Sequence, residues 1–447
     1  MNCKVRFAPS PTGHMHIGNA RIAVINYLFS RKNKGHFLFR IDDTDAERSE
    51  KKYEESIRND LEWLGISYDS SLRQSERTHR YEEIKNQLIE KELLYKCYES
   101  QEELEYKRKL AIGKGKMPIY DRASLKLSKS EQDNLENSGI LPYWRFKLPD
   151  DMTISWNDIV MGNISYNLRN VSDPVIVKTD GTYLYTFTSI IDDLDYEITH
   201  IIRGQDHVTN TSVQMAIFNA ISGSACNINF AHLSLLVNRD GSQFSKRLGS
   251  LNLGNLREEG VDSMSISSLL ATLGSSQDTL PFTSLDDLIE YFDITKFSSN
   301  SPKFDIDELF KLNKKIIHKY SYEEIINKIG EEQCPSESVF DLVHENVEKM
   351  GDFQMWKYIF SDNFECKHRF SDDDKKILLT AYNMLEEHNI DSWIQKVKEV
   401  ACVDGKNLYM PLRIALTGLQ HGPNLTDIVK KLGVLETKRR THKCSSY

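Results

Sequence analysis

Hydrophobic and polar positions along the first 65 residues predict strands and helices in turn. Residues 4–8 and 36–41 are candidates for two short strands. Between them, apolar side chains recur at helical spacing from Ile17 until Gly35 ends the segment. A charged helix with one apolar face follows the second strand and stops at Gly65. This order predicts a parallel sheet with helices on its faces.

The pattern changes beyond about residue 81. Residues 100–135 are highly polar, and residues 143–178 contain strand-like stretches, which together predict an insertion of mixed structure. Strand and helix patterns resume over 182–220, and after about residue 261 the chain consists of amphipathic helical segments with few Gly or Pro. The sequence therefore predicts an α/β N-terminal half that carries an insertion, followed by an α-helical C-terminal half.

Composition sets limits on the kind of protein. The chain has 447 residues, 39% of them hydrophobic, which is enough for about three domains with sizeable cores. Its 66 acidic and 57 basic residues give a net charge of −9, which argues against a simple basic nucleic-acid coat protein. A protein that binds nucleic acid through one face stays possible, because a partner feels local charge rather than the total.

Cysteine usage and hydropathy indicate the compartment. The seven cysteines form no C-x-x-C pair, so a disulfide scaffold is not expected and a reducing environment fits best. The N-terminus shows no apolar stretch typical of a signal peptide. No apolar run approaches the 18 or so residues that span a bilayer. We therefore expect a cytoplasmic protein that has no contact with a membrane.

The richest candidate motif is RFAPSPTGHMHIGNAR, residues 6–21. It follows the first predicted strand and opens the first predicted helix, where ligands of open α/β sheets bind. A helix N-terminus presents free N–H groups and positive potential to phosphate. Gly18 permits close approach of a ligand, and His14 and His16 can donate hydrogen bonds to it. The alternative interpretation of the histidines is that they are surface or capping residues.

A second candidate motif is GSQFSKRLGS, residues 241–250. A mobile lysine such as Lys246 can follow the charge that develops on a transferring phosphoryl group. Taken alone, Ser245-Lys246-Arg247 is a weak signal, because a solvated basic loop is far commoner. The sequence contains no Walker-type phosphate loop.

The two motifs together resemble the HIGH and KMSKS signatures of class I aminoacyl-tRNA synthetases. The resemblance covers essentially the whole chain, in order, and is closest to bacterial glutamyl-tRNA synthetases. Further segments that follow this pattern are RIDDTD at 40–45, WLG at 63–65, QSER at 74–77, DD at 192–193, THIIRGQDH at 199–207 and the stretch 411–418.

The resemblance implies a fold and a domain order. It implies an α/β, Rossmann-type class I synthetase catalytic domain formed by residues 1–85 and 186–236. An inserted α+β acceptor-stem-binding domain would occupy residues 86–185. A stem-contact region with the KMSKS-type loop would follow over 237–315, and an all-α anticodon-binding region over 316–447. A helical C-terminal half separates this pattern from glutaminyl-tRNA synthetases, whose C-terminal region is a β-barrel.

The resemblance also implies site residues. His16 and Lys246 would be catalytic, acting on the charge of the ATP phosphates. The ATP-binding residues would be His14, His16, Gly18, Asn19, Asp206, Leu236, Ser245, Lys246 and Arg247. The glutamate-binding residues would be Arg6, Ala8, Ser10, Asp42, Tyr185, Arg203 and His207.

Two positions depart from the family pattern. The first lysine of the KMSKS signature is replaced by Gln243, and Arg247 would compensate for it. Asp42 stands where many members have glutamate, so its carboxylate is one methylene shorter and a bridging water could complete the contact to the substrate ammonium. Without the resemblance, Arg203 would read as an ordinary ion-pair residue and Tyr185 as a core tyrosine.

Cofactor and RNA contacts follow from the same comparison. Some members bind zinc in the insertion, but Cys97 lacks partner cysteines here. We therefore expect no zinc and no other resident metal, while Mg²⁺ would accompany ATP.

Lys357 aligns loosely with a residue that inspects the anticodon, and a helix-surface lysine is the alternative. Residues 424–443 carry six basic and two acidic side chains, which predicts either part of a basic track for RNA or a solvated tail.

The expected activity is ATP-dependent ligation of L-glutamate to tRNA. The sequence leaves open whether the acceptor is tRNA-Glu, tRNA-Gln or both, and a monomer is expected from the family. Two other classes stay open: a small-molecule adenylyltransferase, against which the long helical half argues, and a tRNA-binding paralogue without catalysis, against which the presence of His16, Lys246 and Arg203 argues.

Overall fold

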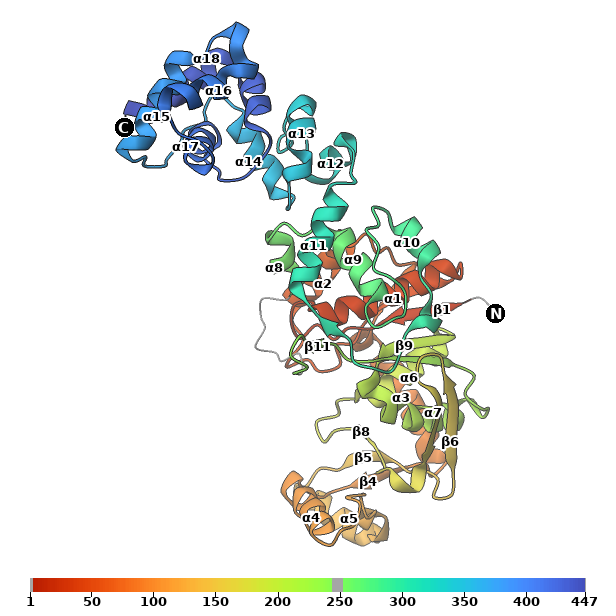
Figure 1. Ribbon diagram of the computed structural model, residues 1–447. Coiled ribbons are helices and arrows are strands. Elements are labelled where there is room, and N and C mark those ends of the chain that lie inside the picture. The colour runs from red at the N-terminus through yellow and green to blue at the C-terminus, as the bar shows by residue number, and fades with distance from the viewer. Residues whose placement is uncertain (1–2, 243–251, 447) are drawn as a thin grey trace. The chain divides into compact units, whose positions relative to one another are not determined.

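The computed structural model describes residues 3–242 and 252–446. The chain divides into two compact units (Figure 1). The first comprises residues 1–257 and 266–306, and the second comprises residues 258–265 and 307–447. The second unit is therefore interleaved with the first along the sequence.

A parallel sheet forms the centre of the first unit. Its strands are β1 (Lys4–Phe7), β2 (His36–Ile41), β3 (Ser70–Arg73), β9 (His200–Gly204) and β10 (Asn229–Leu233). The sets β1-β2-β3 and β9-β10 pair in parallel. The Thr199 N–H donates to the Lys4 carbonyl over 3.0 Å, which places β9 beside β1. The parallel sheet predicted from the sequence is confirmed.

Helices connect these parallel strands, as parallel pairing requires. They are α1 (Ile17–Lys32), α2 (Lys51–Trp63), α3 (Thr78–Glu90), α6 (Tyr185–Asp195) and α7 (Val208–Ser222). Helix α1 begins where the first motif predicts it. Helix α2 buries Ile57 and Leu61 and ends before Gly65, whose φ of +72° favours glycine.

The insertion between α3 and α6 has mixed structure, as predicted. Its elements are β4 (Leu94–Cys97), α4 (Gln101–Gly113), α5 (Lys129–Asn137), β5 (Tyr143–Phe146), β6 (Thr153–Asp158), β7 (Gly162–Asn167) and β8 (Val175–Val177). Strands β4, β5 and β8 form an antiparallel sheet, and β6 and β7 form a hairpin. Alternate residues of β6 are buried, so Ile154, Trp156 and Asp158 point inward.

Short elements complete the first unit and lead to the second. They are β11 (Val237–Asn238), α8 (Leu253–Glu258), α9 (Ser263–Thr272), α10 (Leu285–Tyr291) and β12 (Lys303–Phe304). Strands β11 and β12 pair in parallel.

The remainder of the second unit contains helices, as the apolar periodicity predicts. They are α11 (Ile306–Ile317), α12 (Tyr322–Ile329), α13 (Glu337–Val343), α14 (Gly351–Ile359), α15 (Asp372–Met384), α16 (Ile390–Ala401), α17 (Lys406–Thr417) and α18 (Leu425–Ser446). Trp393 is fully buried among α15, α16 and their neighbours, and its indole N–H donates to the Ala381 carbonyl over 2.9 Å. Gly433, with φ +79° and ψ +164°, kinks α18.

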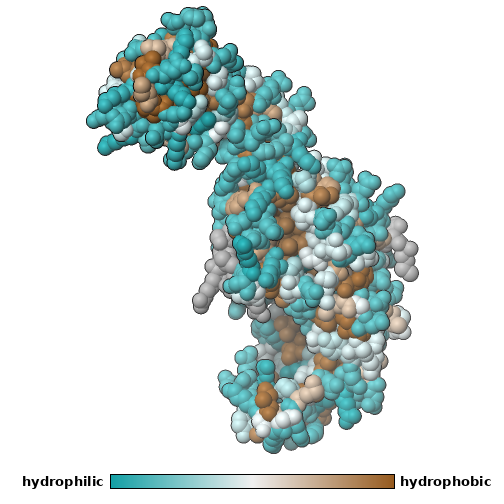
Figure 2. Space-filling model, in the orientation of Figure 1, coloured by the Kyte–Doolittle hydropathy of each residue, from teal (hydrophilic) through white to brown (hydrophobic). Residues whose placement is uncertain are grey.

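The surface is polar over most of the face shown in Figure 2, where hydrophobic residues appear as separate patches. Among the described residues, no helix combines the length and apolar character needed to cross a bilayer.

Candidate active site

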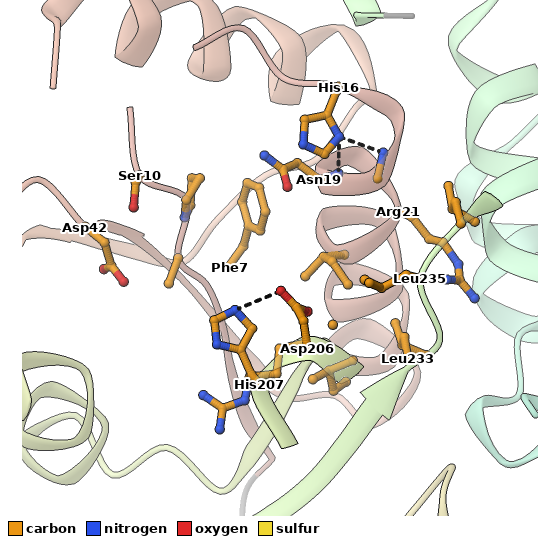
Figure 3. A pocket seen from close by; sticks show the side chains of 18 of the residues that line it. Phe7, Ser10, His16, Asn19, Arg21, Asp42, Asp206, His207, Leu233 and Leu235 are labelled. Atoms are coloured by element: carbon orange, nitrogen blue, oxygen red, sulfur yellow. Dashed lines mark hydrogen bonds and ion pairs between the residues drawn. The ribbon is translucent and has the colours of Figure 1, made fainter. Parts of the chain in front are cut away.

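A cavity of about 450 Å³ opens at the carboxyl ends of β1, β9 and β10, beside the first turn of α1 (Figure 3). Open α/β sheets bind ligands at this edge because the loops there diverge around the strand ends. Side chains from the first motif, from α6 and from the loops after β9 and β10 line it. The lining residues are Arg6–Ser10, His16, Gly18, Asn19, Arg21, Ile22, Asp42, Tyr185, Ile202–Gly204, Asp206, His207 and Leu233–Leu236.

His16 caps helix α1 at one side of the cavity. Its Nδ1 accepts from the backbone N–H groups of Gly18 (3.1 Å) and Asn19 (3.4 Å). A neutral imidazole in this arrangement carries its proton on Nε2. Desolvation lowers the pKa of His16, which favours the neutral form. His16 therefore has an N–H available for an anion next to the positive end of the helix.

Gly18 lies against that imidazole. A Cβ at residue 18 would lie 3.0 Å from Cε1 of His16 and 3.1 Å from its Nδ1. A side chain there would require the imidazole to shift by a few tenths of an ångström. The two residues of the motif thus depend on each other sterically.

Arg203 is a buried cation held by uncharged acceptors. Its side chain donates to the Tyr185 hydroxyl over 3.0 Å and to Thr211 Oγ1 over 2.6 Å. Among the described residues, no carboxylate forms an ion pair with Arg203, which is only 5% exposed. Burial lowers its pKa, as expected of an uncompensated charge. A ligand carboxylate would supply the missing counter-charge.

A network of alternating charges lies beside Arg203. Asp193 Oδ1 accepts from Arg6 Nε (3.2 Å) and from Arg40 Nη1 (2.9 Å). Arg40 also donates to both carboxylate oxygens of Asp42, over 2.6 and 3.1 Å. Asp193 Oδ2 is buried and accepts no hydrogen bond from the described residues. The cavity wall thus carries cations at Arg6 and Arg203 and an anion at Asp42, which suits a ligand with charges of both signs.

Asp42 has an unusual acidity. Burial raises its pKa to about 6 and outweighs the attraction of Arg40, while the nearby charge of Asp192 acts in the same direction as burial. The carboxylate is therefore ionised at neutral pH and protonated in mild acid.

Asp206 and His207 lie next to each other in the cavity wall (Figure 3), with 3.8 Å between Asp206 Oδ2 and His207 Nε2. Burial, and then the charge of Arg203, lower the pKa of His207 to about 4. The imidazole is therefore neutral at physiological pH and adds a polar contact without adding charge.

The structure brings together most of the residues predicted from the motifs. All seven expected glutamate-binding residues line the cavity, as do five of the ATP-binding set: His16, Gly18, Asn19, Asp206 and Leu236. His14 does not line it; its Nδ1 lies 2.9 Å from Ser56 Oγ, and its ring meets Tyr53 edge-on. Ser245, Lys246 and Arg247, together with Gln243, lie outside the described residues.

Several residues at the site carried no predicted role. Arg21, on α1, donates to the carbonyls of Ser234 (2.6 Å) and Leu273 (2.9 Å) and so fixes the loop that ends at Leu236. Arg40 and Asp193 lie within the segments RIDDTD and DD, but no separate function was predicted for either. Two further residues near the site also had no predicted role. Asp158 lies in the insertion, and His232 lies on β10.

The insertion region near Cys97 contains a hydrogen-bonded cluster. Glu99 accepts from the hydroxyls of Tyr120 and Ser124, each over 2.8 Å, and Cys97 Sγ lies 3.5 Å from the Tyr120 hydroxyl. Over the described ranges, no group of three or more His, Cys, Asp or Glu side chains is placed to hold a metal ion.

Most basic residues of 424–443 make contacts within the second unit. Arg440 is buried and donates to the carbonyls of Leu416 and Ile359. Its neighbours form ion pairs: Lys430 with Asp391, Arg439 with Glu436 and Lys443 with Glu365. Of these pairs, Lys430–Asp391 joins α18 to α16, whereas Arg439–Glu436 lies within α18.

Lys357, the expected anticodon contact, lies on α14 and is exposed. Its Nζ donates to the carbonyls of Glu331 (3.1 Å) and Glu332 (2.9 Å). The ammonium is thus oriented by the preceding loop.

Comparison with known families agrees with this geometry, which is that of a class I tRNA synthetase. Residues 2–311 match the family described as tRNA synthetases class I (E and Q), catalytic domain, and residues 302–444 match an anticodon binding domain. The chain belongs to the E and Q family of class I tRNA synthetases. The resemblance and the fold class predicted from the sequence are both confirmed.

Two named relatives and one solved structure are similar to this chain over nearly its full length. The chain is 42% identical to "Glutamate--tRNA ligase 1" of Ehrlichia chaffeensis, covering 97% of this chain and 98% of the relative. It is also 42% identical to "Glutamate--tRNA ligase 1" of Maricaulis maris, covering 96% and 97%. A glutamate tRNA ligase from Elizabethkingia meningosepticum, solved in complex with its amino acid, superimposes with a TM-score of 0.81 at 28% identity, covering 100% of this chain and 99% of that one.

Proposed function

We propose that this protein is a glutamate–tRNA ligase, which couples ATP cleavage to the attachment of L-glutamate to the 3′ end of tRNA. The observation that carries this is the buried guanidinium of Arg203, which lacks a carboxylate partner among the described residues while Asp42 lines the same cavity. A zwitterion with an additional carboxylate matches this arrangement: Arg203 and Arg6 take the side-chain carboxylate, and Asp42 attracts the α-ammonium.

The chemistry requires positioning and charge stabilisation. The α-carboxylate of glutamate attacks the α-phosphate of ATP, and pyrophosphate leaves. The terminal ribose hydroxyl of tRNA then takes the glutamyl group, and AMP leaves. His16 Nε2–H and the N–H groups at the start of α1 hold the phosphates, while Asn19, Asp206 and Leu236 contact the nucleotide.

Mg²⁺ is expected to accompany ATP. The Asp206 carboxylate lines the cavity and belongs to the expected ATP-binding residues. Mg²⁺ prefers oxygen ligands such as carboxylates and phosphates. The ion would neutralise phosphate charge. Stable association of zinc is not expected, and a stoichiometric zinc content after purification in metal-free buffer would contradict that.

The other parts of the chain follow from the same proposal. Residues 86–185 would bind the acceptor stem, 237–315 the stem beyond it, and 316–447 the anticodon, with Lys357 as one contact. Residues 1–85 and 186–236 would form the catalytic domain. We propose a cytoplasmic monomer.

The decisive experiment compares acceptors. Purified protein with ATP, glutamate and transcripts of tRNA-Glu and tRNA-Gln, assayed separately, should yield glutamyl-tRNA on at least one of them. No charging of either transcript or of total tRNA would reject the proposed function. The pattern of charging identifies whether tRNA-Glu, tRNA-Gln or both are substrates.

Lys246→Ala is expected to reduce the rate of glutamyl-adenylate formation by about a hundredfold or more, because Lys246 would stabilise charge on the departing pyrophosphate. The measurement is ATP–pyrophosphate exchange in the presence of tRNA. Lys349→Ala, in the second unit, is the comparison, and its rate should stay close to that of the wild type. Equal rates for the two variants would remove Lys246 from the mechanism.

Asp42 is expected to make glutamate binding sensitive to pH. Its pKa of about 6 means that acidification protonates the carboxylate that attracts the substrate ammonium. The KM for glutamate should therefore rise as pH falls through 6, approaching a tenfold increase near pH 5. His207 does not titrate in this range, because its pKa is about 4.

Asp42→Asn provides the test of that assignment. The variant should show a raised KM at pH 7.5 and little further change down to pH 5. A wild-type profile that is flat across this range, or a variant that keeps the same slope, would contradict the role of Asp42.

A further inference from the structure

A buried polar chain connects the insertion to Arg203. Asp158 is the last residue of β6, in the insertion, and His232 lies on β10 of the parallel sheet. Both side chains are fully buried, and His232 Nδ1 lies 2.5 Å from Asp158 Oδ2. On its other side, His232 Nε2 lies 2.9 Å from Thr211 Oγ1 and 3.4 Å from Arg203 Nε.

The surroundings of Asp158 fix its orientation and charge. Oδ1 accepts from the backbone N–H groups of Val160 (3.1 Å), Met161 (3.0 Å) and His232 (3.1 Å). Burial acts to raise the pKa of Asp158, but the hydrogen bonds from His232 and the backbone lower it overall. Asp158 is therefore a carboxylate whose Oδ2 must accept from His232.

That constraint determines the tautomer of His232. Nδ1 donates to Asp158, so in the neutral ring Nε2 has a lone pair directed at Arg203 and Thr211. Burial, together with the charge of Arg203, keeps the pKa of His232 below its usual value. A protonated ring would direct an N–H at a guanidinium, placing two donors and two positive charges against each other.

We infer that Asp158 and His232 are positioning residues for glutamate recognition: they hold Arg203 through a neutral acceptor. An uncharged acceptor orients the guanidinium without neutralising it, so its charge is kept for the substrate carboxylate. A carboxylate in direct contact with Arg203 would compete with the substrate for the same N–H groups. This inference rests on the proposed function, and it gives the β6 strand of the insertion a part in amino-acid binding.

Asp158→Asn tests the inference by reversing the tautomer. The three backbone donors hold the amide oxygen at the Oδ1 position, so the new NH₂ faces His232 Nδ1 and the ring proton moves to Nε2, toward Arg203. The KM for glutamate should rise about tenfold or more, while the KM for ATP changes less than about twofold. Steady-state charging of total tRNA, with glutamate and ATP varied separately, measures both.

Asp173→Asn is the matched control. Asp173 is also a buried aspartate of the insertion, but it pairs with Arg122 and Tyr95 and does not line the cavity. Its substitution should alter thermal stability without raising the KM for glutamate. An equal rise in both variants would show that any damage to the insertion has this effect, and would overturn the inference.

Two substitutions of His232 separate positioning from packing and cover the case in which Asp158→Asn does not fold. His232→Gln can place an amide oxygen near the former Nε2 and keep an acceptor for Arg203, whereas His232→Asn reaches only toward Asp158. The inference predicts a lower KM for glutamate in the Gln variant than in the Asn variant. The reverse order would overturn it.

The wild-type protein separates failure of the inference from failure of the proposed function. If the wild type charges no tRNA with glutamate, the proposed function fails. If it charges tRNA and Asp158→Asn retains the wild-type KM for glutamate, the proposed function stands and the positioning role is wrong.

Discussion

Arg203→Met is expected to remove glutamate use while leaving the fold at least as stable. Arg203 is buried, and the described residues provide hydroxyl and imidazole acceptors but no ion-paired carboxylate. Without it, the substrate carboxylate would enter a site that lacks its main counter-charge, so kcat/KM for glutamate should fall on the order of a thousandfold. Removing an uncompensated buried charge in favour of an apolar side chain of similar length is neutral or stabilising, by ~1 kcal/mol.

Arg40→Met is the matched control, because Arg40 is equally buried but has carboxylate partners. It donates to Asp42 and Asp193, so its loss leaves two buried carboxylates with less compensation. The expected cost is about 3–5 kcal/mol of unfolding free energy. The free energy of unfolding, measured by thermal and urea denaturation, should therefore stay the same or rise for Arg203→Met and fall for Arg40→Met. The two variants should differ by several kcal/mol. Similar destabilisation by both would show that Arg203 contributes to the fold rather than waiting for a ligand.

The contrast between these arginines shows what sequence patterns can and cannot predict. The local sequence located β1, α1 and β2, because their buried apolar residues are neighbours in the chain. The first motif located His16 and Gly18, whose contact spans two residues. Predicting these features required only neighbouring positions.

The partners of Arg203 could not be found in this way. Asp158 and His232 are 74 residues apart and belong to different parts of the first unit, so their contact depends on how the insertion packs on the sheet. The same holds for the basic residues of α18, whose partners are distant in the sequence. Lys430 forms an ion pair with Asp391, and Arg440 is buried and donates to backbone carbonyls. Charge counted along the chain therefore does not show which charged side chains are paired within the fold.

Family resemblance contributed what neither periodicity nor local charge could. It assigned Tyr185, Arg203 and His207 to one ligand although they come from α6, β9 and the turn that follows β9, and the structure places all three on the cavity wall. It assigned His14 to ATP binding; in the structure that side chain contacts Ser56 and Tyr53 and does not line the cavity. Membership of a motif therefore indicates a neighbourhood, and the backbone geometry decides which side chains face the ligand.

His16→Asn is expected to lower the rate of adenylate formation by a factor of about 100–1,000, the usual loss when one donor to a developing negative charge is removed. Asparagine is a good N-cap, so its side-chain oxygen can still accept from the first turn of α1. It has no group at the position of Nε2–H. Stability should therefore change little, while ATP–pyrophosphate exchange in the presence of tRNA falls sharply.

His16→Ala separates the two functions of the imidazole. It removes both the cap and the donor, so it should show the same loss of rate and, in addition, about 1 kcal/mol lower stability. Ser284→Ala is the cap control: Ser284 caps α10 through the Asp287 N–H and does not line the cavity. It should lose similar stability with no loss of rate. If His16→Asn keeps the wild-type rate, the imidazole only caps the helix, and the phosphates must then be held by the N–H groups of α1 and by residues elsewhere.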